Sequence, residues 1–225
     1  MDTYRTEEEQ VEALRKWWNE NGRSTIIAVV HPLGGGFGWQ AWQQHKADEA
    51  AMASARYEQM VELFTATTTA EDAANLKSVA RGFKSDFPDS TYASFAALHL
   101  ARLAVVEDDL AGAETELRWV LTQNPEREVR LVTELRLARV IAAQGRLDEA
   151  LGIVGGVEAG AYEPAYAELE GDIQQQLGNT GAAIAAYQRA MTLAAGSNEG
   201  PSEGLRLKLQ ALMPVPARKL AVLEE

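Results

Sequence analysis

Apolar residues recur every three to four positions along most of the chain, a spacing that predicts α-helices. The first helix is expected over residues 6–22, where apolar side chains share one face. Thr6 and Glu9 form a capping box at its start. Asn21 and Gly22 tolerate the left-handed conformation of a helix C-terminus and are predicted to end it. The apolar face consists of Val11, Leu14 and Trp18.

The next segment, residues 25–42, has no formally charged side chain and suits the length of a membrane-spanning helix. His31, Pro32 and four glycines weaken its hydropathy. An α-helix from Trp18 to Trp39 is roughly 32 Å long, close to the thickness of the hydrocarbon core. Tryptophans at both ends match the aromatic belts of a membrane. These are Trp17, Trp18, Trp39 and Trp42. We interpret the segment as a transmembrane anchor; the alternative is a buried glycine-rich loop of a soluble protein.

Positive charge predicts the orientation of this anchor. Arg15, Lys16 and Arg23 lie shortly before it, whereas only Lys46 lies close after it. The positive-inside rule then places the N-terminus in the cytoplasm and the rest of the chain across the membrane.

A glycine cluster within the anchor lacks the pattern of a phosphate-binding loop. Gly34 and Gly38 instead have the spacing that lets two membrane helices approach closely. Because glycine is frequent in membrane helices in any case, the same spacing is compatible with no helix contact.

From residue 43 onward the sequence is rich in alanine and repeats itself. Ala113, Ala150 and Ala183 are equivalent positions, 37 and 33 residues apart. Each lies in the second helix of a predicted pair, after a turn and after a small residue in the first helix. This pattern resembles the tetratricopeptide repeat. The small residues allow paired helices to pack closely.

Two further elements extend these repeats. Residues 43–64 and 70–87 resemble a degenerate helix pair, and residues 201–212 are expected to form a closing helix that begins near Ser202. The predicted fold class is all-α: a tetratricopeptide-like helical solenoid preceded by a single N-terminal transmembrane helix.

The first helices of the repeats are expected to line a concave groove. Arg102 and Arg139 occupy equivalent positions on this face, and Asp172 is their equivalent in the third repeat. Two guanidinium groups can bind the carboxylates of a partner in bidentate fashion. The alternative is that each arginine pairs with an acidic neighbour such as Glu134 or Asp172. Three further candidates for partner contact lie one turn earlier: Phe95, Leu135 and Glu168.

Composition narrows the functional classes. The formal net charge of −12 argues against nucleic-acid binding, which needs clustered lysine and arginine. The chain has no cysteine and three scattered histidines, and it contains none of the common catalytic motifs. We therefore expect no enzymatic activity, no cofactor and no metal site.

The acidic helix TEEEQVEALRKWWNENGRS, the segment GGFGWQAW and the repeats containing ETELRWVLTQNP and LRLARVIAAQGRLDEAL together resemble the YfgM family. That resemblance implies a single-pass inner-membrane protein of Gram-negative bacteria, with a periplasmic repeat domain that is an ancillary part of the SecYEG translocon. It also implies a membrane-anchored periplasmic chaperone of the prolyl-isomerase type as partner, and restraint of a cytoplasmic stress-response regulator. His31–Leu33 depart from the uninterrupted apolar run expected in the anchor.

Together these inferences predict three parts: a cytoplasmic amphipathic helix (1–24), a transmembrane anchor (25–42) and a periplasmic tetratricopeptide-like domain with a C-terminal capping helix (43–225). The expected function is a non-enzymatic adaptor that links protein export to periplasmic chaperones. The alternative is a soluble tetratricopeptide scaffold for another complex.

Overall fold

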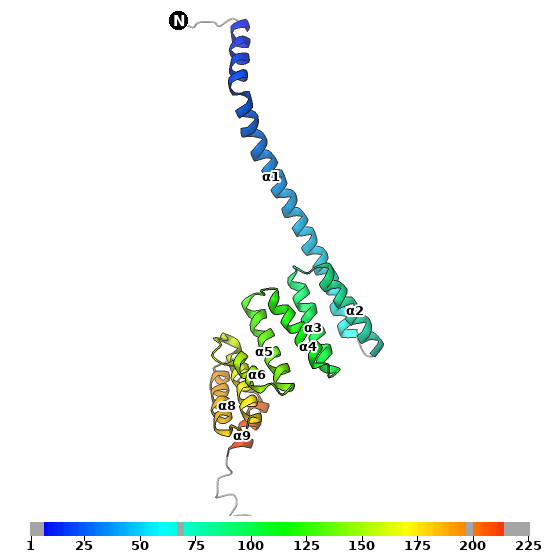
Figure 1. Cartoon of the computed structure of the whole chain (residues 1–225), viewed down its shortest axis with the longest axis vertical. Helices are drawn as coiled ribbons and strands as arrows, with labels where there is room; N and C mark the ends of the chain where they lie inside the picture. Colours follow the sequence, from blue (N-terminus) through cyan, green and yellow to red (C-terminus); the bar gives the residue numbers. More distant parts are fainter. Residues whose placement is uncertain (1–6, 67–69, 197–199, 214–225) are drawn as a thin grey trace, which may run out of the picture. The chain divides into compact units, whose positions relative to one another are not determined.

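The computed structural model describes residues 7–66, 70–196 and 200–213, and these residues form helices and turns without a β-strand (Figure 1). The all-α fold class is therefore confirmed. The helices are α1 (Glu7–Ala66), α2 (Ala70–Asp86), α3 (Thr91–Val106), α4 (Leu110–Thr122), α5 (Arg127–Ala143), α6 (Leu147–Val154), the 3₁₀ turn η1 (Gly160–Tyr162), α7 (Glu163–Gln176), α8 (Thr180–Ala195) and α9 (Glu203–Leu212). The chain divides into two units, residues 1–55 and 56–225.

The first unit is the N-terminal part of the long helix α1. The predicted helix end at Asn21 and Gly22 is wrong, because the helix continues through both residues. The Asn21 side chain donates a hydrogen bond to the Trp17 carbonyl at 3.2 Å, and the Ser24 hydroxyl donates one to the Asn21 carbonyl at 3.1 Å. The Trp18 ring lies 3.1 Å from where a Cβ on Gly22 would stand. These side chains contact the preceding turn, and the backbone stays helical through Gly22 without a C-cap.

Residues of the predicted anchor lie on this same helix. Within residues 7–66, 70–196 and 200–213, no helix is both long enough and apolar enough to cross a membrane. A Cβ added to Gly38 would meet no neighbouring atom within 4 Å, whereas for Gly34 the structure describes only the helical backbone. Thr6 of the expected capping box lies outside the described residues. The four tryptophans are exposed: Trp17, Trp18, Trp39 and Trp42.

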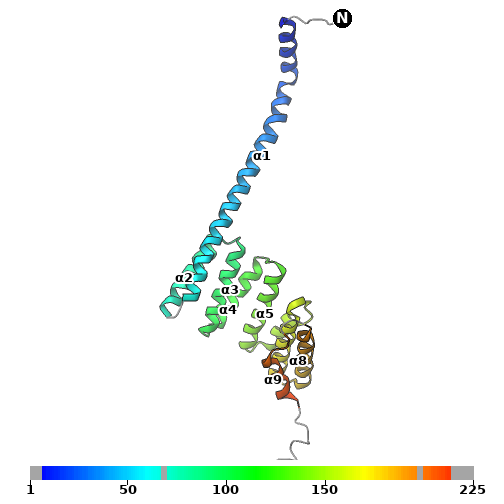
Figure 2. The same ribbon diagram turned by 180° about the vertical axis from the view of Figure 1, so that it is seen from behind.

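The second unit consists of helix hairpins stacked side by side (Figures 1 and 2). Helix α3 pairs with α4, α5 with α6 and α7 with α8, and each hairpin also contacts the next. Three residues separate the two helices of every pair. The three predicted repeats and their common register are therefore confirmed.

The turns inside the hairpins share one backbone conformation. Asp108, Gly145 and Gly178 occupy the same turn position and have positive φ angles of 62°, 81° and 80°. The following amide then bonds back to the end of the first helix, as Asp109 does to the Ala104 carbonyl at 2.8 Å. This is a Schellman arrangement, which favours glycine because a side chain strains the left-handed conformation. Asp108 carries that strain in the first repeat.

Close contact between paired helices depends on small residues in the first helix. A Cβ added to Gly171 on α7 would lie 2.5 Å from the ring of Tyr187 on α8. Tyr187 is fully buried, so glycine is required for this approach. The equivalent alanines of the second helices are also fully buried: Ala113, Ala150 and Ala183.

Additional helices cover both ends of the stack. At one end Tyr57, within residues 56–66 of α1, packs against Phe83 of α2 with ring centroids 6.3 Å apart. At the other end α9 begins where the Ser202 hydroxyl accepts a hydrogen bond from the Leu205 amide at 3.1 Å. Leu205 is 2% exposed and packs on α8. The closing helix is confirmed, and residues 56–66 of α1 pack on α2 as part of the predicted upstream pair.

Candidate functional site

The arginines that the sequence placed in the groove are exposed on neighbouring first helices. Arg102 lies on α3, and Arg139 lies on α5 together with Arg136 one turn earlier. Within residues 7–66, 70–196 and 200–213, none of the three forms an ion pair or a side-chain hydrogen bond. We call these residues the arginine face: Arg102, Arg136 and Arg139. Sequence reasoning missed Arg136, although its spacing of three residues from Arg139 indicates a shared helix face.

The acidic neighbours proposed as alternative partners bind elsewhere. The Tyr166 hydroxyl, which donates to the Leu131 carbonyl at 2.8 Å, lies beside Glu134. Burial, followed by the charge of Glu134, raises the pKa of Tyr166 to about 12. Asp172 binds the closing helix instead of an arginine. Glu134 and Asp172 therefore do not neutralise the arginine face.

Two predicted contact residues, Glu168 and Asp172, attach the closing helix. The Lys208 ammonium on α9 lies 2.8 Å from a carboxylate oxygen of each. The Tyr187 hydroxyl donates a second hydrogen bond to Asp172, also at 2.8 Å. Burial and this bond both raise the pKa of Tyr187. The structure gives Glu168 and Asp172 a role inside the fold.

The remaining predicted candidates, Phe95 and Leu135, differ in exposure. Leu135 is 6% exposed and belongs to the hydrophobic core, so it presents little surface to a partner. Phe95 is half-buried on α3 and lies in a group of aromatic rings. We call this group the aromatic cluster: Tyr57, Phe64, Tyr92, Phe95 and His99.

Residues far apart in the sequence assemble the aromatic cluster. The Tyr57 ring centroid lies 5.0 Å from that of Tyr92 and 5.9 Å from that of Phe95. Phe64 stacks on His99 at 3.9 Å, and the Tyr57 hydroxyl lies 3.4 Å from His99 Nε2. All five side chains are half-buried, which leaves part of each ring accessible. Because α1 supplies two of the rings, the sequence pattern of the repeats could not predict the cluster.

His99 joins the aromatic cluster to the arginine face. Phe95, His99 and Arg102 follow one another at i, i+4 and i+7 on α3, a spacing that places them on one side of the helix. Burial, then the charges of Arg102 and Arg136, lower the pKa of His99 below its usual value. Half-buried rings of the aromatic cluster therefore lie near two guanidinium groups of the arginine face, those of Arg102 and Arg136.

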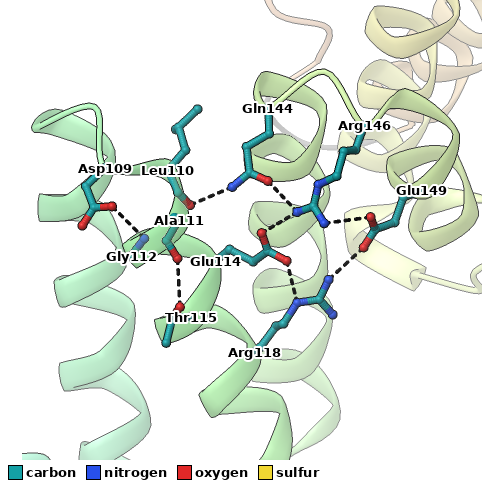
Figure 3. Close-up of polar contacts among 10 residues, drawn as sticks. All are labelled: Asp109, Leu110, Ala111, Gly112, Glu114, Thr115, Arg118, Gln144, Arg146 and Glu149. Carbon is teal, nitrogen blue, oxygen red and sulfur yellow. Dashed lines mark hydrogen bonds and ion pairs between the residues drawn. The ribbon is translucent and has the colours of Figure 1, made fainter.

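Two other arginines of the second unit, Arg118 and Arg146, have structural partners. Figure 3 shows Arg118 and Arg146 between Glu114 and Glu149, which connect α4 to the start of α6. Arg118 lies 2.7 Å from Glu114 and 2.8 Å from Glu149, and Arg146 also pairs with both acids. Burial alone would raise the pKa of Glu114, but the hydrogen bonds and charges around it lower the pKa. This network ties neighbouring repeats together, in contrast to the arginine face.

No group of acidic or histidine side chains suited to a metal ion occurs in the part of the chain that the structure describes. Stacked helix hairpins with a surface of rings and unpaired cations are typical of proteins that bind other proteins. The fold therefore defines a helical-repeat protein.

Comparison with known proteins identifies its family. Residues 15–214 match the tetratricopeptide repeat-like domain family. A protein of Haemophilus influenzae is 33% identical over 82% of this chain and 88% of its own length, and one of Aggregatibacter actinomycetemcomitans is 34% identical with the same coverage. A third, of Escherichia coli, is 28% identical over 84% of this chain and 88% of its own length. All three are named ancillary SecYEG translocon subunit. The chain belongs to this family, the YfgM family that the sequence motifs indicated.

Proposed function

We propose that the protein is a non-enzymatic adaptor associated with the SecYEG translocon. The observation that carries this proposal is the similarity to translocon subunits over more than four fifths of the chain. Stacked helix hairpins supply large surfaces for protein partners, and the described residues contain no candidate metal site. An adaptor needs a surface for its partners and a means of attachment to the membrane.

For attachment we propose the predicted arrangement: residues 1–24 in the cytoplasm, residues 25–42 as a single anchor in the inner membrane, and residues 43–225 in the periplasm. Support comes from the uncharged segment, the exposed tryptophans at its two ends, and the basic residues that precede it. An anchor would hold the repeats close to the translocon, where high effective concentration makes weak contacts sufficient.

Single-cysteine variants test this topology, since the chain has no cysteine of its own. Glu12→Cys and Glu203→Cys replace exposed residues on opposite sides of the proposed anchor. In cells with a permeabilised outer membrane, an impermeant maleimide should label Glu203→Cys and leave Glu12→Cys unlabelled. Labelling in the reverse pattern would overturn the topology. Release of the chain from membranes by carbonate would favour the soluble scaffold for another complex.

Three partners follow from the family resemblance. We propose that the anchor contacts the translocon channel, that the periplasmic unit binds a membrane-anchored chaperone of the prolyl-isomerase type, and that residues 1–24 restrain a cytoplasmic stress-response regulator. Gly34 and Gly38 give the anchor a face on which another helix can approach closely.

Co-purification from detergent-solubilised membranes tests the channel contact. Replacement of Gly34 and Gly38 by leucine should reduce the translocon recovered with the tagged chain, because larger side chains separate the helices. Gly36→Leu is the matched control, since Gly36 lies two residues from each glycine and faces another side of a helix. Equal loss with the control would show that bulk in the anchor, and not this face, is responsible. Unchanged recovery with every variant would contradict the proposed face.

A further inference from the structure

We propose that the arginine face and the aromatic cluster form one docking surface for an extended, acidic segment of a partner protein that carries an aromatic side chain two or three residues from its carboxylates. This inference rests on the proposed adaptor function and specifies the chemistry of the partner. It depends on three properties of the surface: unpaired positive charge, half-buried rings, and the spacing between them.

The charge of this surface contrasts with the rest of the chain. The protein has 33 acidic and 21 basic residues, so acidic partners for a cation are abundant. Most other described cations of the second unit use them: Arg56, Lys77, Lys84, Arg118, Arg146, Arg189, Arg206 and Lys208 all form ion pairs. Three guanidinium groups without such partners on one face favour an incoming anion.

Carboxylates are the anions that this face suits best. A guanidinium group presents parallel N–H donors that match the two oxygens of an Asp or Glu side chain. The charges of Arg102 and Arg136 both act on the ring of His99, so the two cations lie close to one point. Neighbouring carboxylates on one peptide would relieve the repulsion between them. The cations occur beside protein-binding features, on a chain too acidic overall for nucleic acid.

The aromatic cluster supplies the second half of the recognition. Its rings are already held by one another, as in the stack of Phe64 on His99 at 3.9 Å. A partner ring could pack on these half-buried side chains at little entropic cost, because they are fixed before binding. Aromatic and arginine side chains together are also the residue types that dominate protein interfaces.

The spacing sets the length of the bound segment. Phe95 and Arg102 are seven residues apart on α3, which corresponds to roughly 10 Å along the helix. An extended chain covers that distance in about three residues. The favoured segment therefore has its aromatic residue two or three positions from an acidic pair.

Fluorescence anisotropy with the full chain in a neutral detergent tests the proposal. The probe is a fluorescein-labelled peptide, Gly-Ser-Phe-Ser-Glu-Asp-Gly, and two control peptides replace Glu-Asp by Gln-Asn or Phe by Ser. The parent peptide should bind most tightly, and added salt should weaken it because the cations are exposed. Charge reversal with Arg102→Glu and Arg139→Glu should weaken binding about tenfold or more.

The matched control reverses the same amount of charge elsewhere. Arg81 and Arg130 are exposed and form no ion pair within the described residues, and Arg130 lies on the opposite side of α5 from Arg139. Arg81→Glu with Arg130→Glu should leave binding nearly unchanged, and circular dichroism should show that both double variants fold.

Three results would overturn the docking surface: no binding of the parent peptide, equal binding of the Gln-Asn peptide, or equal weakening by both double variants. The last would mean that net charge alone attracts the probe. Co-purification of the translocon with the same variants separates this failure from failure of the proposed function. If the translocon is still recovered while the peptide does not bind, the adaptor function stands and only the docking surface is refuted.

Discussion

Substitution of Gly171 by alanine should destabilise the protein, although alanine is the better helix former. A Cβ at this position would lie 2.5 Å from Cδ1 and Cε1 of the Tyr187 ring, well inside ordinary van der Waals contact. The ring cannot easily move away. It is fully buried, and its hydroxyl donates to Asp172 at 2.8 Å and lies 3.0 Å from Gln175 Oε1.

Two opposing terms give the magnitude. Removal of glycine from a helix interior gains about 1 kcal/mol. Overpacking of a dense core costs about 1–3 kcal/mol, and the anchored tyrosine puts this site in the upper part of that range. The expected net loss is therefore about 1–2 kcal/mol, which corresponds to a decrease in Tm of roughly 3–6 °C for a chain of this size.

Urea denaturation of the full chain, followed by circular dichroism, measures this loss. Gly152→Ala is the matched control, because Gly152 is also helical but has no atom within 4 Å of the added Cβ. The control should stabilise the protein by about 0.5–1 kcal/mol. Opposite signs for the same chemical change would isolate the contact with Tyr187.

A double-mutant cycle locates the cause more sharply. In the second repeat, the positions equivalent to Gly171 and Tyr187 are occupied by Ala138 and Val154. Tyr187→Leu should therefore relieve the crowding, with a coupling of about 1 kcal/mol between the two substitutions. Close packing is not the reason for glycine at position 171 if Gly171→Ala is as stabilising as Gly152→Ala. The same conclusion follows if the effects of Gly171→Ala and Tyr187→Leu are strictly additive.

Two further predictions concern backbone strain and protonation. Asp108→Gly should stabilise the protein by about 0.5–1 kcal/mol in urea denaturation, because φ is 62° at this turn and glycine adopts that conformation without strain. Gly178→Ala, at the equivalent position with φ 80°, should destabilise the protein by about 1 kcal/mol. Equal effects of the two substitutions would contradict the explanation by backbone strain. Burial and nearby arginines lower the pKa of His99 in the folded state. The unfolded state therefore binds more protons than the folded state as the pH falls below about 6.5, the ordinary pKa of histidine. The free energy of unfolding should decrease as the pH is lowered through that value. His99→Gln should reduce this pH dependence, and Arg136→Gln should raise the pKa of His99 measured by NMR; an unchanged pKa would refute the influence of the arginine face.

Local patterns determined most of the fold. Helical periodicity and the spacing of Ala113, Ala150 and Ala183 were sufficient for the hairpins, since each repeat makes the same contacts within itself and with its neighbours. Ser202 marked the start of the closing helix for an equally local reason, the hydrogen bond of an N-cap. The end expected at Gly22 was wrong because the same residues can also continue a helix, and the Trp18 ring packs over it.

Tertiary structure alone decided which side chains of the groove face remain available. Equivalent positions in the repeats have different fates: Arg102 and Arg139 stay unpaired within the described residues, whereas Asp172 is bound by Lys208, 36 residues later in the chain. The aromatic cluster likewise needs Tyr57 from α1 beside rings of α3. Repeat register is encoded by short-range spacing, but the pairing of charges and rings depends on contacts between distant segments, which no local pattern specifies.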